Sequence, residues 1–319
     1  MATSGSVNYT QNSNQIIQGA LRHLGMYGIG RVVSNEVMAL AQDTLNDLVL
    51  EISISPHMWT ESEGYLFPVI NTSEFKIGPS ASHAHAVDKA DAVITRISGN
   101  HIATDTTLVV ESTTGMTAAD VIGIALTNKN IDWTTIVSVD SSTTLTITTG
   151  LTTAARDDSM VYTYTSKINK PMSIDHIRKM SGWDAGTTST LRETAIELES
   201  RFDYLDRSDK TRNGEPTLAY VKKARDSVDV HLWPRPSDAH MYYTFNYFKR
   251  IEDFDNGTDS PDFPPEWIPA IKLGLAIRMA PSVGKDAKME SLILLASQVV
   301  QQLHGFDAES VKIMLGIAE

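Results

Sequence analysis

The composition changes twice along the chain, and this change most constrains its fold. Residues 80–166 hold 19 Thr in 87 residues, with Glu111 as the one Glu and with Lys89 and Lys129 as the two Lys. β-Branched residues favour strands, and their runs recur here at intervals of about ten residues between turn signals. The block therefore predicts an inserted β-barrel or sandwich of about five strands. The expected strands are 107–110, 121–125, 134–139, 145–148 and 161–164.

The segment before this block predicts two helices. Ser13 precedes one run that stops at Gly25, and Ser34 precedes a second run that Pro56 ends. The apolar positions, spaced three and four residues apart, are Ile16, Ile17, Ala20, Leu21 and Leu24, then Val37, Leu40, Ala41, Thr44, Leu45, Leu48 and Ile52. Such stripes have to be buried against another element. Short strands are expected at 66–70 and 75–77.

The segment after the block predicts strands first. Residues 173–180 are expected to form a strand, and 191–207 to be mostly helical, with Leu198, Phe202 and Leu205 as the inner side. Residues 228–233 and 242–248 are expected to pair as an antiparallel hairpin.

The last part of the chain predicts helices at 267–279 and 289–303, each with one apolar stripe, and a short helical turn after Asp307. Two helices at each end of the chain can bury one another's stripes. The sequence therefore predicts an α+β fold. Its expected centre is a four-helix bundle built from the N- and C-terminal helices, with β-strands and the Thr-rich block between them.

These patterns divide the chain into four segments. The expected core comprises 1–79, a helical hairpin with short strands, and 167–303, with further strands and the last two helices. The β-rich domain 80–166 is inserted between them, and 304–319 forms a C-terminal segment.

The charge balance weighs against nucleic-acid binding as the main task. The chain has 27 Lys and Arg against 39 Asp and Glu, a formal net charge of −12. Tight binding to any DNA depends on cations that neutralise phosphates, whereas an acidic surface repels DNA and suits a channel through which DNA slides.

The absence of Cys removes disulfides and thiolate chemistry. No apolar stretch approaches the ~20 residues of a membrane span, and the N-terminus lacks signal-peptide features, so we expect a soluble protein.

The search for catalytic or metal-binding motifs assigns no site. His83 and His85 form a His-Ala-His pair without a third ligand at a suitable spacing, and we interpret them as part of a flexible junction. The acidic loop 252–262 fails the calcium-loop pattern, because Gly257 and Thr258 stand where an oxygen ligand and a glycine are needed. A glycosidase needs only two carboxylates, and 39 are available, so hydrolase activity stays open. We expect no enzyme activity, no cofactor and no metal.

Aromatic residues gather at Trp233 and along 242–248. Such a group can form a platform on which bases or sugars stack. A strand pair of this kind more often supplies a core face, with Tyr hydroxyls at its rim. We interpret these aromatics as core.

Three stretches, taken in order, carry a resemblance. The first holds Ile17, Ala20, Leu21, Arg22, Leu24 and Gly25, then Ser34, Glu36 and 45–48; the second is 213–216 with 230–236; the third holds Ile251, Asp253 and Phe254, then 261–267, Ala270, Leu273, Leu275 and Ala276. Their order and spacing resemble the head-to-tail adaptor family of tailed bacteriophages, also called tail accessory or gatekeeper proteins. The Thr-rich block departs from that pattern and is interpreted as a variable decoration.

The resemblance implies a structural virion protein at the neck, made in the host cytoplasm. Its expected partners are the portal protein, further copies of itself in a dodecameric ring, and a downstream tail protein such as the nozzle or tail tube. Double-stranded DNA would pass the lumen without tight binding, and no membrane is involved. C-terminal segments of the family reach the portal, so the expected portal-binding residues are Phe306, Val311, Ile313, Met314 and Leu315. The same residues can instead form a terminal helix that folds onto its own bundle.

Two other classes of function stay open. The chain can be a tail-associated protein that binds glycans on the host surface, with the Thr-rich block as its recognition module. It can also be a cell-wall hydrolase that is delivered with the tail.

Overall fold

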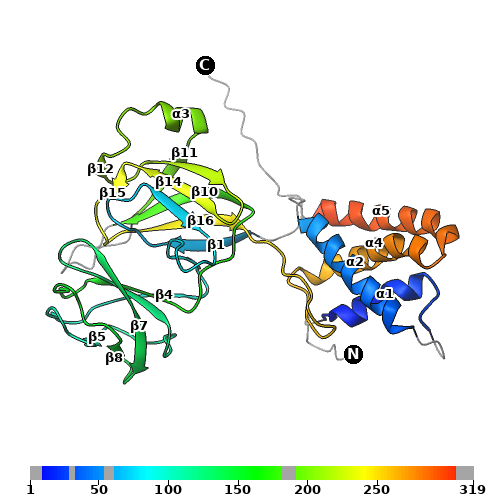
Figure 1. The fold of residues 1–319 in the computed structure, drawn as a ribbon, viewed down its shortest axis with the longest axis horizontal. Coiled ribbons are helices and arrows are strands. Elements are labelled where there is room, and N and C mark those ends of the chain that lie inside the picture. Colours follow the sequence, from blue (N-terminus) through cyan, green and yellow to red (C-terminus); the bar gives the residue numbers. More distant parts are fainter. Residues whose placement is uncertain (1–8, 29–32, 54–60, 182–191, 307–319) are drawn as a thin grey trace, which may run out of the picture. The chain divides into compact units, whose positions relative to one another are not determined.

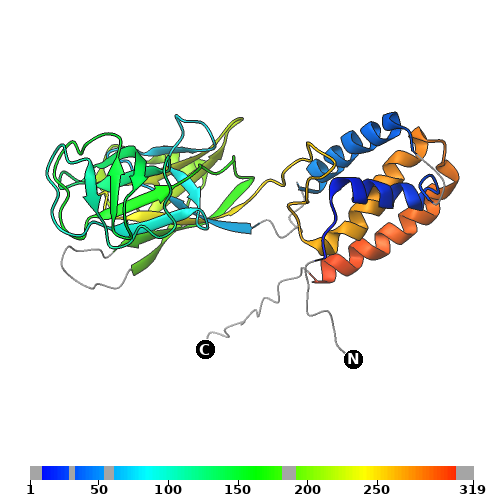
Figure 2. The same ribbon diagram turned by 90° about the horizontal axis from the view of Figure 1, so that it is seen from below.

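The chain folds into two units, each with its own core, in a computed structural model that describes residues 9–28, 33–53, 61–181 and 192–306 (Figures 1 and 2). The helical unit combines Met1–Thr60 with Ile251–Glu319, and the β unit is Glu61–Arg250. The two ends of the chain therefore belong to one unit, and everything between them to the other.

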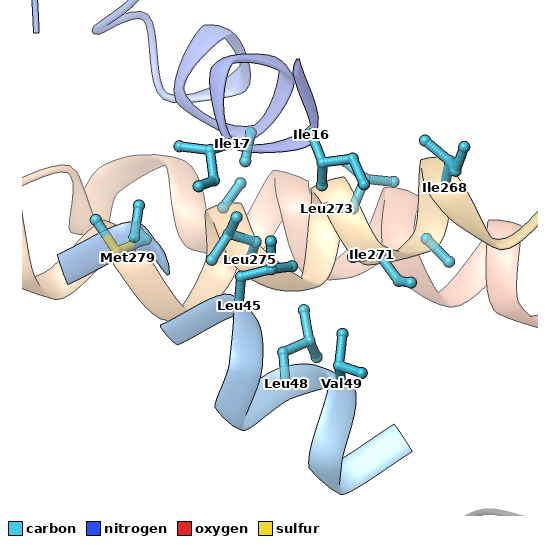
Figure 3. Packing of buried hydrophobic residues seen from close by; sticks show 14 of the residues in the cluster. Ile16, Ile17, Leu45, Leu48, Val49, Ile268, Ile271, Leu273, Leu275 and Met279 are labelled. Atoms are coloured by element: carbon cyan, nitrogen blue, oxygen red, sulfur yellow. The ribbon is translucent and has the colours of Figure 1, made fainter. Parts of the chain in front are cut away.

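The helical unit is built around α4 (Ile268–Ser282). Helix α4 packs against α1 (Ser13–His23), α2 (Asn35–Ser53) and α5 (Met289–Phe306). Short 3-10 turns, η1 (Pro265–Trp267) and η2 (Asp286–Lys288), precede α4 and α5. Side chains from α1 reach α4 on one side and side chains from α2 reach it on another (Figure 3). Its buried residues are Ile268, Ala270, Ile271, Leu273, Leu275, Ala276, Met279 and Ala280.

The start of α1 differs slightly from the prediction. Asn12 is the N-cap, in a reciprocal capping box with Gln15 that satisfies two backbone N–H groups. Ser13 is instead fully buried, and its Oγ donates to the backbone oxygen of Asn256 at 2.8 Å. Gly25 follows the helix with a φ of +73°, where a glycine is favoured, as predicted for the helix stop.

The acidic loop 252–262 fastens α1 and α2 to the rest of the helical unit. The backbone N–H groups of Ser13 and Asn14 donate to Asp259 and Gly257 oxygens, each at 3.0 Å. Asn46 of α2 accepts from the N–H of Phe254 at 3.0 Å and donates to its oxygen at 3.1 Å. The loop thus serves as a hydrogen-bonded connection to both helices.

The predicted fold class, an α+β four-helix bundle with inserted β material, is wrong. The chain is mostly β, with sixteen strands in the described residues, and its larger unit is made of sheets. The strands outside the Thr-rich block do not merely connect helices, because eight strands join into one sheet. Sequence periodicity revealed the long helices and many of the strands locally, but it did not reveal the pairings between distant strands that make the sheet the main architecture.

The eight-stranded sheet is nearly closed. Its order is β2-β14-β13-β11-β10-β16-β1-β3, and the N–H of Ala84, just before β3, donates to the oxygen of Lys76 in β2 at 2.8 Å. The strands are β1 (Glu61–Leu66), β2 (Glu74–Ile77), β3 (Ala86–Asp88), β10 (Ser173–Ser181), β11 (Arg192–Leu198), β13 (Leu218–Lys223), β14 (Val228–Trp233) and β16 (Tyr242–Phe248). A two-residue pair, β12 (Asn213–Gly214) with β15 (Arg235–Pro236), lies beside it.

The Thr-rich block forms a six-stranded barrel. The sheet order is β4-β9-β6-β7-β8-β5, and a bridge between Ile97 and Val110 joins the two edge strands. The strands are β4 (Ala92–Arg96), β5 (Thr107–Val109), β6 (Val121–Ala125), β7 (Ile131–Val139), β8 (Thr144–Ile147) and β9 (Met160–Tyr164). Branched residues fill the inside, among them Ile122, Ile124 and Val161. Closure removes the exposed edges that an isolated sheet would present.

An aromatic seam joins the barrel to the eight-stranded sheet. The seam comprises Phe67, Tyr162, Tyr242, Trp133, Tyr164 and His85. The His85 and Trp133 rings stack at 3.6 Å between centroids with 2° between planes, and the Tyr162 hydroxyl donates to the oxygen of Ala239 at 2.8 Å. Aromatic contacts and satisfied hydroxyls make this an interior surface and exclude water from it.

Three local predictions fail in the β unit. The strand expected at 66–70 is instead β1, which ends at Leu66. Residues 191–207 are not one helix, because β11 is followed by the short helix α3 (Arg201–Asp206). The expected inner side of that helix, Leu198, Phe202 and Leu205, is exposed. The strands 228–233 and 242–248 exist but do not pair with each other. Strand β14 pairs with β13 and β2, while β16 pairs with β1 and β10.

The seam predicts a pH dependence of stability. Burial, and after it the positive charge of Lys167, lowers the pKa of His85 to about 3. The unfolded chain takes up a proton near pH 6.5, which folded His85 does not, so stability is complete above pH 6.5 and falls as the pH decreases towards 3. We expect the loss of unfolding free energy between pH 7 and pH 4.5 to be about 2 kcal/mol smaller in His85→Phe than in the wild type. Urea unfolding at both pH values measures it.

The exposed His176 provides the control, because His176→Gln removes a histidine without touching the seam. Equal losses in the wild type and in His85→Phe would contradict the prediction.

Candidate assembly surface

One side of helix α5 is buried in the helical core, and the opposite side exposes large apolar residues. Leu292 and Leu303 are buried in the helical core, with Met289, Ala296, Val299 and Val300 packed against it. On the opposite side, Leu294, Gln298 and Gln301 follow one another at spacings of four and three residues and are exposed. Leu294 is 64% exposed, and Ile293 and Leu295 beside it are 50% and 43% exposed. We call these five residues the α5 outer face.

The α5 outer face carries no charge. No Asp, Glu, Lys or Arg occurs from Ser291 to Phe306. The solvent side of a surface helix is ordinarily charged, and contiguous exposed apolar residues mark interaction sites. Because these leucines are only partly exposed, each would gain on the order of 1 kcal/mol on complete burial. The α5 outer face therefore has the chemistry of a surface that another protein covers.

Sequence reasoning used the buried side of α5 and missed this face. It identified the stripe with Leu292, Val299 and Leu303, which the structure confirms as inward-facing. The sequence does contain a signal for this face, because no charged residue occurs over the last turns of the helix.

The side chains predicted to bind the portal all lie outside the described part of the chain. Val311, Ile313, Met314 and Leu315 lie outside the described residues. Phe306 is the last residue of α5, and its side chain also lies outside the description. Their role stays a prediction, and by sequence they continue directly from the helix that carries the α5 outer face.

His83 and His85, the predicted histidine pair, both make contacts that hold the fold together. The Lys167 ammonium donates to the backbone oxygens of Ala81 and His83 at 3.0 and 2.5 Å, which holds the loop in place. His85 Nδ1 lies 2.6 Å from the Tyr164 hydroxyl. The interpretation of this region as a flexible junction is therefore wrong, because its backbone and both its histidines have specific contacts.

Across the described ranges, no three side chains of the His, Asp and Glu type gather as they would around a metal ion. Among the helices of those ranges, none is long and apolar enough to span a membrane.

The aromatic strand is core, as interpreted from the sequence. Tyr243 and Phe245 are fully buried in the eight-stranded sheet. Trp233 is covered by the Arg207 guanidinium, 4.4 Å from the ring centroid, and its Nε1 donates to the oxygen of Asp209 at 2.6 Å. This arrangement leaves the strand without the exposed rings that a stacking platform needs.

No protein-family model and no curated protein matches the chain. Among solved structures, a similarity is found to VP17, a capsid protein of bacteriophage P23-77. It covers 63% of this chain and 73% of that chain, with 10% sequence identity and a TM-score of 0.12. A similarity at this level assigns no fold to the chain.

Two substitutions in α5 test whether its outer face is free in the isolated chain. Leu292→Glu places a charge in the core, and we expect it to lower the free energy of unfolding by about 3 kcal/mol or more. Leu294→Glu lies two residues away on the outer face, and we expect a change within about 0.5 kcal/mol. Urea unfolding followed by circular dichroism measures both. A large loss in Leu294→Glu would show that the chain covers this face itself.

Proposed function

We propose that the chain is a structural virion protein, a head-to-tail adaptor that forms a ring beneath the portal and connects the capsid to the tail. The observation that carries this proposal is the α5 outer face, where three large apolar residues and two glutamines are exposed on one uncharged helix side. Such a surface is what an assembly subunit needs and what a soluble enzyme avoids.

The direction of the chain supports a portal contact at this surface. Of the predicted portal-binding residues, Phe306 is the last residue of α5, and Val311 and Met314 follow it in the sequence. In the proposal, the α5 outer face and the segment 304–319 bind the portal together.

The net charge of −12 supports the proposed passage of DNA. Phosphates are repelled by carboxylates, so a ring of acidic subunits lets double-stranded DNA slide without adhering. The proposed protein is not an enzyme and needs no cofactor.

Glycan binding by the Thr-rich block is less favoured by its residues. The block holds three aromatic residues, Trp133, Tyr162 and Tyr164, and all three lie in the aromatic seam. Sugar recognition commonly depends on an exposed aromatic face, whereas the aromatic rings of the barrel pack against the eight-stranded sheet.

Analytical ultracentrifugation of the protein, alone and mixed with rings of its cognate portal, tests the proposed function. We expect a monomer that joins portal rings at one copy per portal subunit. Leu294→Glu and deletion of 307–319 are each expected to weaken this binding at least about tenfold, because each removes apolar contact area. The exposed Val137 of the barrel provides a matched control, since Val137→Glu adds the same charge to a different surface.

A wild-type protein that stays monomeric and free in the presence of portal rings would overturn the adaptor function. A glycan-array signal or muralytic activity from that protein would then favour one of the other two classes.

A further inference from the structure

A cluster of cations lies on the outside of the helical unit. It consists of Arg22 and His23 at the end of α1, Lys272 of α4 and Lys288 of η2, which we call the basic patch. The Lys272 stem runs beside Gly19 of α1, where an added Cβ would lie 2.7 Å from its Cε. The Lys288 ammonium donates to the backbone oxygen of His23 at 3.3 Å. These contacts bring three elements and their cations to one place.

The cations of the basic patch act on one another. Burial lowers the pKa of Lys272, and the positive charge of Arg22 lowers it further. Burial also lowers the pKa of His23, and Lys272 adds to the effect. Within the described residues, no carboxylate lies within ion-pair distance of Arg22, Lys272 or Lys288. The patch therefore repels itself and favours an anionic partner.

Helix α2 carries the opposite charge on its exposed side. Glu36, Leu40, Asp43, Asp47 and Leu50 are exposed and follow one another at alternating spacings of four and three residues. They line one side of the helix, which we call the acidic seam. Leu40 and Leu50 are 42% and 44% exposed. Among the described residues, Asp43 and Asp47 have no ion-pair partner.

We propose that copies of the chain associate head to tail, with the basic patch of one copy against the acidic seam of the next. This inference rests on the proposed ring and names the surfaces by which its subunits meet. A ring needs two different surfaces on each subunit, one for each neighbour, and the helical unit presents two of opposite charge. Complementary charges set the register and the rate of association, and Leu40 and Leu50 supply apolar contact at the acidic seam.

The overall charge favours a second copy over DNA as the occupant of the basic patch. A chain with a net charge of −12 repels both its own copies and phosphates over most of its surface. Binding of DNA usually depends on an extended positive surface, whereas this patch has three permanent cations. The acidic seam offers three carboxylates to them, so the two surfaces match in number as well as in sign.

Paired charge reversal tests the proposal. Variant A carries Asp43→Lys and Asp47→Lys, and variant B carries Arg22→Glu and Lys288→Glu. In either variant alone, like charges meet at every contact, and we expect ring assembly on cognate portal rings to weaken on the order of a hundredfold. In an equimolar mixture, each basic surface of A meets an acidic surface of B, and we expect assembly to be restored. Sedimentation velocity at 50 mM and 300 mM salt measures assembly.

A matched pair on the β unit, Asp175→Lys with Lys223→Glu, changes charge at exposed sites outside both surfaces and is expected to assemble as the wild type does. Thermal unfolding of A and B separately checks that each folds. Variants A and B that assemble on the portal like the wild type would overturn this inference while leaving the adaptor function intact. A failure to rescue in the mixture would also overturn it. Loss of binding of variant B to a short DNA duplex, with normal ring assembly, would assign the patch to DNA instead.

Discussion

Helix α4 buries eight apolar residues and carries only Lys272 and Arg278 as charged residues, and the helical unit exists because three other helices cover it. Helices α1 and α2 come from the beginning of the chain and α5 from its end, so neither end of the chain forms the core of the helical unit alone. An isolated helix of this length is marginal in water, and burial of side chains such as Ile271, Leu275 and Met279 stabilises it. The loop 252–262 makes the arrangement specific, because its backbone is bound by Ser13, Asn14 and Asn46. The covering helices are then free to use their outer sides for contacts with other molecules.

The outer sides of these helices differ in their chemistry, which supports the different contacts that we propose for them. Helix α5 presents uncharged apolar groups, α2 presents carboxylates between two leucines, and the end of α1 with Lys272 presents cations. An uncharged face suits a permanent contact that excludes water, whereas charged faces suit contacts whose register has to be set. A subunit that binds both its neighbours and a different protein needs both kinds of surface.

The local structure was more predictable than the fold. Five of the six barrel strands are predictable because β-branched runs and turn residues alternate there, and the prediction locates Val121–Ala125 to the residue. The sixth, β4, is not among the predicted strands. The architecture is not predictable in this way, because β14 pairs with β2, and β16 pairs with β1 and β10, strands that are distant in sequence or separated by the barrel. The spacing of Leu198, Phe202 and Leu205 predicts a helix over 191–207, whereas Thr194 and Ile196 alternate as in the strand that forms. In α5, apolar periodicity located the buried side, but only the absence of charge marks the outer one.

The aromatic seam bears on how such a chain can change in evolution. The barrel lies in the sequence between β3 and β10 and was interpreted as a variable decoration. Yet Phe67 and Tyr242 are buried and contact Tyr162 of the barrel, with Tyr65 half-buried beside Tyr242. A relative without the barrel would expose these rings and be prone to aggregate, unless the positions had become polar as well. We therefore expect polar residues at the positions of Phe67 and Tyr242 in a relative that never had the insertion.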